Sequence, residues 1–145
     1  TSKIVADELK KLGYTVRTGP YAGDIVTVDG PEYETVAGCG SNIGIFNPPD
    51  IIELNFYCDT YGIDSISFGT LTAFVMECYE AGILDKEKTG GLDLRFGNAD
   101  AALELLHRMA RTARDSSLDA TTWVSRSVLR SIDAKHRSMS NLVAT

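Results

Sequence analysis

Residues 48–82, PPDIIELNFYCDTYGIDSISFGTLTAFVMECYEAG, decide the fold that the sequence predicts. The two prolines suit the first turn of a helix, and apolar residues then recur at near-helical spacing as far as Tyr61. Gly62 is placed to end this helix. A second apolar series predicts a helix over about 67–81, with Gly82 as its stop. Two helices joined by a short turn therefore form the expected centre of the molecule.

Weaker helical signals lie on either side of this centre. Residues 2–12 are amphipathic and precede Gly13, which predicts a helix and its end. Asn98 suits the N-cap of another helix, whose apolar residues run as far as Met109. A last helix is expected over residues 118–134.

The β signals lie near the N-terminus. Residues 14–18 and 24–28 are β-prone, and the Gly- and Pro-containing stretch 19–23 between them has the composition of a hairpin loop. The predicted fold class is therefore mainly α, a helical domain with a small N-terminal β-hairpin.

Size and composition limit the class of protein. A chain of 145 residues that is 43% hydrophobic suits one globular domain. It contains no apolar run near the ~20 residues that cross a bilayer, so we expect no membrane partner. The three cysteines are an odd number and include no CxxC pair, which favours a reducing cytoplasm over a disulfide framework.

The net charge of −6 is unevenly distributed. Residues 1–107 hold 7 Lys and Arg against 17 Asp and Glu, whereas residues 108–145 hold 7 basic and 3 acidic residues. The acidic body argues against nucleic acid as a partner. The basic tail either contacts an acidic surface or forms a solvated helix face.

A glycine-rich stretch, TVAGCGSNIGIFN at 35–47, permits close backbone approach. It is neither a Walker loop nor a dinucleotide fingerprint, because no Gly-Lys-Ser/Thr follows it and no apolar strand leads into it. Cys39 within it is either an accessible thiol or a small residue in a tight turn.

Four carboxylates are the candidates for chemistry. Glu32 and Glu34 would point to opposite sides if extended, so that one faces a pocket as a general acid or base, or both lie on a surface turn. Asp59 lies near the negative end of a helix dipole, which suggests a donor-rich partner such as Arg, backbone N–H or a ligand amine. Asp64 either joins Asp59 in binding or caps the following helix.

Five motifs follow one another in a specific order: GPEYET at 30–35, GSNIGI at 40–45, CDTYGIDSIS at 58–67, MECYEAGIL at 76–84 and LRFGNA at 94–99. In this order they resemble the aldehyde ferredoxin oxidoreductase family over about residues 19–110. The resemblance implies the fold of the family's central helical domain. It also implies a tungsten or molybdenum centre on two pterins beside a 4Fe–4S cluster, and oxidation of aldehydes to carboxylic acids with electrons passed to a ferredoxin-type carrier.

The resemblance also implies roles for individual residues. The family's pterin motif, Asp-x-x-Gly-Leu-Asp/Cys, falls on Asp59, Gly62, Ile63 and Asp64, with Ile63 in place of Leu. The glutamate near the metal falls on Glu34, as a general acid or base. In dimeric members a Glu and a His from each subunit can bind a bridging metal, and Glu53 and His107 lie at or near the matching positions, so a homodimer is one expected assembly.

The chain also departs from the family pattern. It has no cysteine before Cys39, where the family places three cluster ligands, and it has no second pterin motif. We therefore divide the chain into a poorly matching segment 1–18, a family-like domain 19–110 and a divergent basic tail 111–145. The expected function is a fragment or subunit of such an oxidoreductase, which supplies one pterin-binding wall beside the remaining domains or subunits. The alternative is a non-catalytic helical interaction domain that has lost the cofactor.

Overall fold

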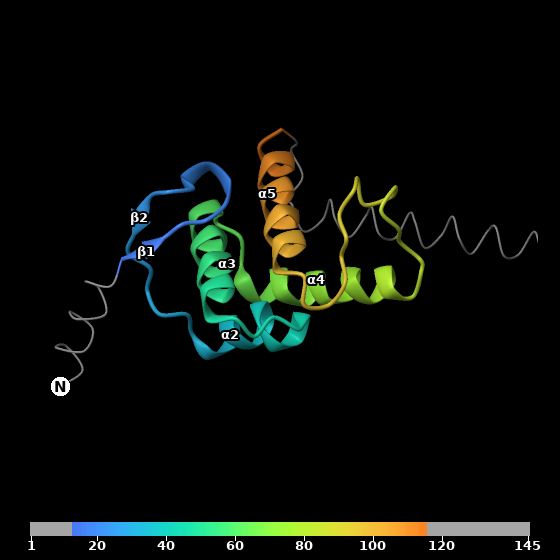
Figure 1. The fold of residues 1–145 in the computed structure, drawn as a ribbon, viewed down its shortest axis with the longest axis horizontal. Helices are drawn as coiled ribbons and strands as arrows, with labels where there is room; N and C mark the ends of the chain where they lie inside the picture. The colour runs from blue at the N-terminus through green and yellow to red at the C-terminus, as the bar shows by residue number, and fades with distance from the viewer. Residues whose placement is uncertain (1–12, 116–145) are drawn as a thin grey trace, which may run out of the picture.

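A computed structural model describes residues 13–115 of the chain, and the expected helices at 2–12 and 118–134 lie outside them. Within this part the fold is mainly helical with a small two-stranded hairpin, as the sequence predicts (Figure 1). The proposed division at 18 and 110 stays a prediction. In chain order the elements are β1 (Tyr14–Thr15), the 3-10 turn η1 (Gly19–Tyr21), β2 (Ile25–Val26), α2 (Tyr33–Cys39), the 3-10 turn η2 (Ser41–Ile43), α3 (Pro48–Tyr61), α4 (Ser65–Glu80) and α5 (Ala99–Asp115).

The first central helix, α3, begins and ends where the sequence predicts. A proline occupies its first turn, where the missing N–H has no intrahelical partner to lose. At its end Gly62 adopts a left-handed conformation with φ 68°. The N–H of Gly62 donates to the Asp59 carbonyl and that of Ile63 to the Cys58 carbonyl, which is a Schellman motif.

The second central helix, α4, begins at Ser65, two residues earlier than the apolar series indicates. The reason is its cap, because the Asp64 carboxylate accepts a hydrogen bond of 2.7 Å from the Ser67 N–H. The helix ends in a second Schellman motif, in which Gly82 and Ile83 donate to the carbonyls of Tyr79 and Cys78.

The last described helix, α5, begins after the predicted cap. The side-chain oxygen of Asn98 accepts a hydrogen bond of 3.1 Å from the Ala101 N–H. Its buried face continues the core of α3 and α4, so burial and not propensity alone stabilises the helix. Core residues with almost no exposed surface include Leu54, Tyr57, Phe68, Met76, Leu106 and Met109.

The hairpin is shorter than the β-prone runs that predict it. Tyr14 pairs with Val26 and Thr15 with Ile25 in antiparallel register. In Figure 1 the hairpin lies beside α3, whereas α3 and α5 stand next to each other over α4. No helix in the described part, residues 13–115, is long and apolar enough to span a membrane.

One helix, α2, was not expected from the sequence. It covers the first five residues of the glycine-rich stretch, 35–39, and packs on α4, where Gly38 and Gly69 meet backbone to backbone. The close approach expected of the glycines is therefore confirmed. Packing against α4 compensates for the low intrinsic helix propensity of glycine, which explains why local sequence missed the helix.

Candidate functional site

The turn at residues 59–64 presents two carboxylates to solvent. Asp59 and Asp64 are both exposed, and the left-handed Gly62 between them has no other group within 4 Å of the place where a Cβ would stand. Ile63 is partly buried and packs against the hydrophobic core, and this contact anchors the turn to the rest of the protein. The turn is therefore an open, acceptor-rich surface mounted on a rigid helix end.

The two aspartates differ in their internal partners. Asp64 caps α4, which confirms the capping alternative, and its hydrogen bonds from Ser67 hold the pKa of its carboxyl below the usual value. Asp59 has a long contact of 3.5 Å with the Asn55 side-chain amide. Asp59 thus retains more capacity to accept hydrogen bonds from a ligand.

These residues fit the pterin that the family resemblance implies. A pterin offers N–H donors on its ring and amino group, and carboxylates are acceptors for such donors. The open space beside Gly62 allows a flat group to approach the backbone, which any side chain at this position would obstruct. Both the hydrogen-bond acceptors of the turn and its open shape therefore suit a pterin.

Glu34 lies on a neighbouring element. It stands in the first turn of α2 and is exposed, as is Glu32 at the N-cap, so the extended arrangement considered for these two residues is wrong. Only Glu32 is extended, because the residues that follow it form α2, which packs against α4. A hydrogen bond of 2.8 Å joins the hydroxyls of Thr35 and Ser65. This bond ties the residue after Glu34 to the residue after Asp64, and no local sequence pattern predicts it.

Glu53 occupies a different place, inside the protein. Its carboxylate is fully buried and accepts hydrogen bonds from three residues of the hairpin region. The donors to Glu53 are the Tyr14 hydroxyl at 2.6 Å, the Arg17 N–H at 3.2 Å, the Arg17 Nε at 2.9 Å, the Thr18 N–H at 2.8 Å and the Thr18 hydroxyl at 2.6 Å. Arg17 also pairs with Asp50.

This cluster shifts the pKa of its members. Burial acts to raise the pKa of Glu53, but hydrogen bonds from Thr18, Tyr14 and Arg17 outweigh it and hold the pKa below the usual value. Burial and the hydrogen bond to Glu53 raise the pKa of Tyr14 to about 12. Glu53 is therefore a charged carboxylate with its oxygens directed at protein donors.

His107 approaches the same cluster from α5. Its side chain is 4% exposed, and its Nδ1 lies 2.8 Å from the hydroxyl of Tyr61. Its Nε2 lies 3.5 Å from the hydroxyl of Thr18. Burial lowers the pKa of His107, which favours the neutral imidazole. The structure thus brings Glu53 and His107 to one cluster, with Thr18 between them.

The bridging metal that the resemblance implies does not fit this pair. Each oxygen of Glu53 and each ring nitrogen of His107 faces a protein group. A metal ligand needs an unengaged lone pair directed at the ion. Among residues 13–115, no group of three or more His, Cys, Asp or Glu is placed to hold a metal ion.

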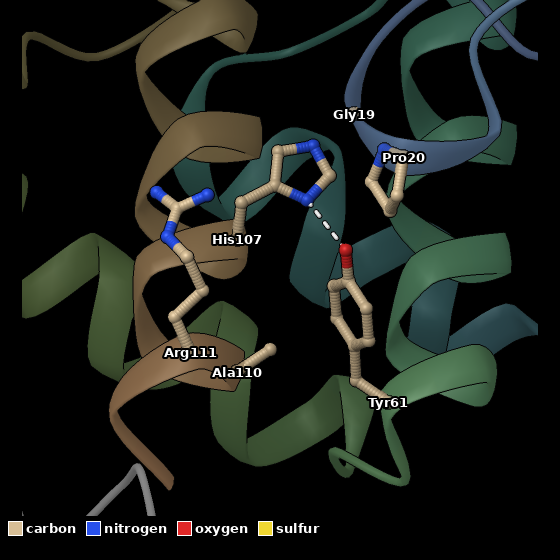
Figure 2. Close-up of a pocket in the computed structure, with 6 residues that line it drawn as sticks. All are labelled: Gly19, Pro20, Tyr61, His107, Ala110 and Arg111. Atoms are coloured by element: carbon tan, nitrogen blue, oxygen red, sulfur yellow. Dashed lines mark hydrogen bonds between the residues drawn. The ribbon is translucent and has the colours of Figure 1, made fainter. Parts of the chain in front are cut away.

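A pocket of about 330 Å³ opens beside His107 (Figure 2). Tyr61 points into it toward the imidazole, and Arg111 extends from the same helix as His107. Arg111 pairs with Glu104 at 3.0 Å. The residues that line the pocket are Gly19, Pro20, Tyr61, His107, Ala110 and Arg111.

The cysteines take no part in these surfaces. Cys39, Cys58 and Cys78 are all buried and free of disulfides. Contact with the Cys39 thiol, together with burial, raises the pKa of Cys58. Of the two alternatives for Cys39, the accessible thiol is therefore wrong, although the residue closes helix α2 and does not lie in a bare turn.

Comparison with known proteins decides the family. A family model described as aldehyde ferredoxin oxidoreductase, domains 2 and 3, matches residues 11–118. The chain belongs to the aldehyde ferredoxin oxidoreductase family. The matched region contains the turn at 59–64 together with Glu34, Glu53 and His107.

Individual relatives agree with this assignment. A Pyrococcus furiosus protein named aliphatic sulfonate oxidoreductase, WOR-like subunit, is 42% identical over 97 residues, which is 67% of this chain and 15% of that protein. A tungsten-containing aldehyde ferredoxin oxidoreductase of Pyrococcus horikoshii is 39% identical over 94 residues, 63% of this chain and 16% of that enzyme. The Thermococcus kodakarensis enzyme of the same name is 39% identical over 83 residues, 57% of this chain and 14% of the enzyme.

The difference in length limits what these names convey. The match spans about one-sixth of the length of such relatives. The chain therefore corresponds to part of a larger family enzyme, and the activity of the whole enzyme is a proposal for this chain.

Proposed function

We propose that this chain supplies one wall of a tungsten–pterin site in an oxidoreductase that converts aldehydes to carboxylic acids. The observation that carries the proposal is the turn at 59–64, which presents Asp59 and Asp64 around an open Gly62 within the family-matched region. Molybdenum is the alternative metal. In this role the turn holds the cofactor and the chemistry takes place next to it.

Each residue of the turn has a distinct task. The carboxylates of Asp59 and Asp64 accept hydrogen bonds from N–H groups of the pterin. The absent side chain at Gly62 lets the ligand approach the backbone. Ile63 anchors the turn through its contact with the core.

Glu34 is the proposed general acid or base. Its helix is tied to the start of α4 by the bond between Thr35 and Ser65, so Glu34 keeps a fixed relation to the cofactor turn. The tungsten centre, when bound, supplies the two-electron redox chemistry. The carboxylate of Glu34 holds or releases the proton that accompanies the transfer of electrons. Such acid–base catalysis contributes about 10²- to 10⁴-fold in rate.

The remaining parts of the proposed enzyme lie outside the matched motifs. In the family the 4Fe–4S ligands and the second pterin motif lie outside the matched motifs, and electrons pass to a ferredoxin-type carrier. An apolar pocket of about 360 Å³ supports contact with the remaining part of the enzyme. The residues that line it include Val36, Ile45, Phe46 and Ile52. Phe46 is 76% exposed, and Tyr33, which precedes Glu34 in the sequence, is 83% exposed, so apolar surface is left for a partner to cover.

A chimeric enzyme tests the proposal. Residues 11–118 would replace the matching segment of the Pyrococcus horikoshii relative, produced anaerobically in a host that makes the pterin cofactor. We expect a tungsten-loaded enzyme that oxidises aldehydes. Asp59→Asn should lower tungsten per chain, whereas Glu34→Gln should keep the tungsten and lower kcat by about 10²- to 10⁴-fold. Asp100→Asn, an exposed acid in the first turn of α5, is the matched control.

The alternative function, a non-catalytic interaction domain, predicts a different result. A chimera that folds but holds no tungsten in any variant would favour that alternative and contradict the proposal. Equal tungsten content in Asp59→Asn and Asp100→Asn would show that the turn does not bind the cofactor.

A further inference from the structure

His107 connects three segments that are distant in sequence. It projects from α5 between the end of α3 and the loop η1, as Figure 2 shows. The ring packs edge-on against Tyr57, with centroids 4.5 Å apart, and Tyr57 in turn stacks on Tyr61 at 5.3 Å. The imidazole is therefore fixed by aromatic packing before any polar contact is counted.

One ring nitrogen engages the proposed cofactor turn directly. Tyr61 is the third residue of the motif at 59–64 and immediately precedes Gly62. Its hydroxyl lies 2.8 Å from His107 Nδ1. Because Tyr61 is the last residue of α3, fixing its side chain also restrains the backbone from which the turn starts.

The other ring nitrogen completes a chain with one consistent direction. The Thr18 hydroxyl donates a hydrogen bond to Glu53 Oε1, with 2.6 Å between the two oxygens. The Thr18 oxygen is then left to accept a hydrogen bond from His107 Nε2. The neutral imidazole then carries its proton on Nε2 and accepts from Tyr61 at Nδ1. The hydrogen bonds run from Tyr61 through His107 and Thr18 to Glu53, and each donor meets one acceptor.

The loop η1 closes the ring in this position. Gly19 has φ 71°, and a Cβ on it would lie 2.5 Å from His107 Cε1 and 2.7 Å from Nε2. Glycine is required here both for its conformation and for the close approach. An ion at Nε2 would have to displace either this loop or the contact with Thr18.

We propose that His107 is a positioning residue that holds the cofactor turn through Tyr61, and not a ligand of a bridging metal. The negative charge of Glu53 is balanced by Arg17, whose Nε lies 2.9 Å from Glu53 Oε2. Glu53 therefore needs no metal ion to balance its charge. Only the identity of the ligand on the turn rests on the proposed function, since the restraint on the turn is a property of this chain alone.

Amide exchange in the full chain, labelled with ¹⁵N, tests the restraint. The reporters are the N–H groups of Gly62 and Ile63, and the internal control is the matching turn at Gly82 and Ile83, which has the same hydrogen-bond pattern. His107→Phe keeps a ring but removes both nitrogens, and Tyr61→Phe removes only the hydroxyl. We expect each variant to speed exchange at the first turn by about 2- to 10-fold and to leave the second turn unchanged.

Two comparisons decide the outcome. If His107 acts through Tyr61, the double variant exchanges no faster at Gly62 and Ile63 than either single variant. Additive effects, or equal acceleration at both turns, would mean general destabilisation and would overturn the proposal. Neither result depends on tungsten, so this test can fail while the proposed function stands.

Zinc titration tests the exclusion of metal. The ring ¹⁵N resonances of His107 should keep the pattern of an Nε2–H tautomer with excess Zn²⁺ present, with His136→Gln as background to remove the second histidine of the chain. Zn²⁺ that binds with one ion per one or two chains, shifts the His107 nitrogens and no longer binds after Glu53→Gln would overturn the proposal.

Discussion

The backbones of Gly38 in α2 and Gly69 in α4 lie in direct contact. A Cβ on Gly69 would fall 2.5 Å from the carbonyl oxygen of Gly38, a distance at which the two helices would have to move apart. This contact places Glu34 on α2 beside the start of α4, and hence beside the turn that carries Asp59 and Asp64. The geometry of the proposed site therefore depends on the missing side chain of Gly69.

Substitution of these glycines should have unequal effects. Gly69→Ala should lower the free energy of unfolding by about 1–3 kcal/mol or more, because the methyl group meets backbone that cannot rotate away. Gly38→Ala is the matched control, since its Cβ would lie 3.6 Å from the nearest atom, the Ser65 carbonyl oxygen. Urea unfolding measures both. Equal losses in the two variants would contradict the backbone contact.

The buried carboxylate of Glu53 should be a major source of stability. Glu53→Ala leaves the donors of Tyr14, Arg17 and Thr18 facing a cavity, and we expect a loss of about 2–4 kcal/mol in the free energy of unfolding. Glu104→Gln is the control, because its pairs with Arg108 and Arg111 are largely solvated and should contribute less than about 1 kcal/mol. A mild effect of Glu53→Ala in chemical denaturation would show that the cluster is not formed.

Two substitutions of Asp64 should distinguish its capping hydrogen bond from its negative charge. Asp64→Ala removes the acceptor for the Ser67 N–H and should lower the thermal midpoint by about 2–6 °C. Asp64→Asn keeps an acceptor with similar capping strength and should leave the midpoint nearly unchanged. Circular dichroism melting curves distinguish the two. If Asp64→Asn melts as early as Asp64→Ala, the carboxylate charge and not the hydrogen bond is what matters.

Acid should destabilise the protein through His107. Its pKa in the folded state is lowered by burial, so the unfolded chain, with a pKa near 6.5, binds the proton first. Stability from this group is fully present above pH 6.5 and decreases as the pH falls through and below that value. His107→Phe should remove this part of the pH dependence between pH 7 and pH 5. Unfolding in urea at several pH values gives the slopes, and an identical slope in the variant would refute the assignment.

The thiols should be inert in the native protein. Cys39, Cys58 and Cys78 are buried, and these three are all the cysteines in the sequence. Their reaction with Ellman's reagent should be at least about 100-fold slower in buffer than in denaturant, because exchange requires local opening. Rapid labelling of one thiol in buffer would mean that its segment is open in solution.

The sequence by itself determined the elements whose signals are local. The helices α3 and α4 end at Gly62 and Gly82 because a left-handed residue closes each helix through hydrogen bonds within its own last turn. The hairpin, the cap at Asn98 and the family motifs are likewise local in the chain. Periodicity and turn chemistry are sufficient for such features.

Only the tertiary structure decided which residues meet. Tyr61 and His107 are 46 positions apart, and Thr18 lies 35 positions from Glu53, so no pattern in the sequence pairs them. The helix α2 was missed for the same reason, because Gly38 favours a helix only when Gly69 of α4 is against it. Burial then directs Glu53 and His107 toward protein partners, since a buried polar group without a partner costs free energy that only its neighbours in space can offset.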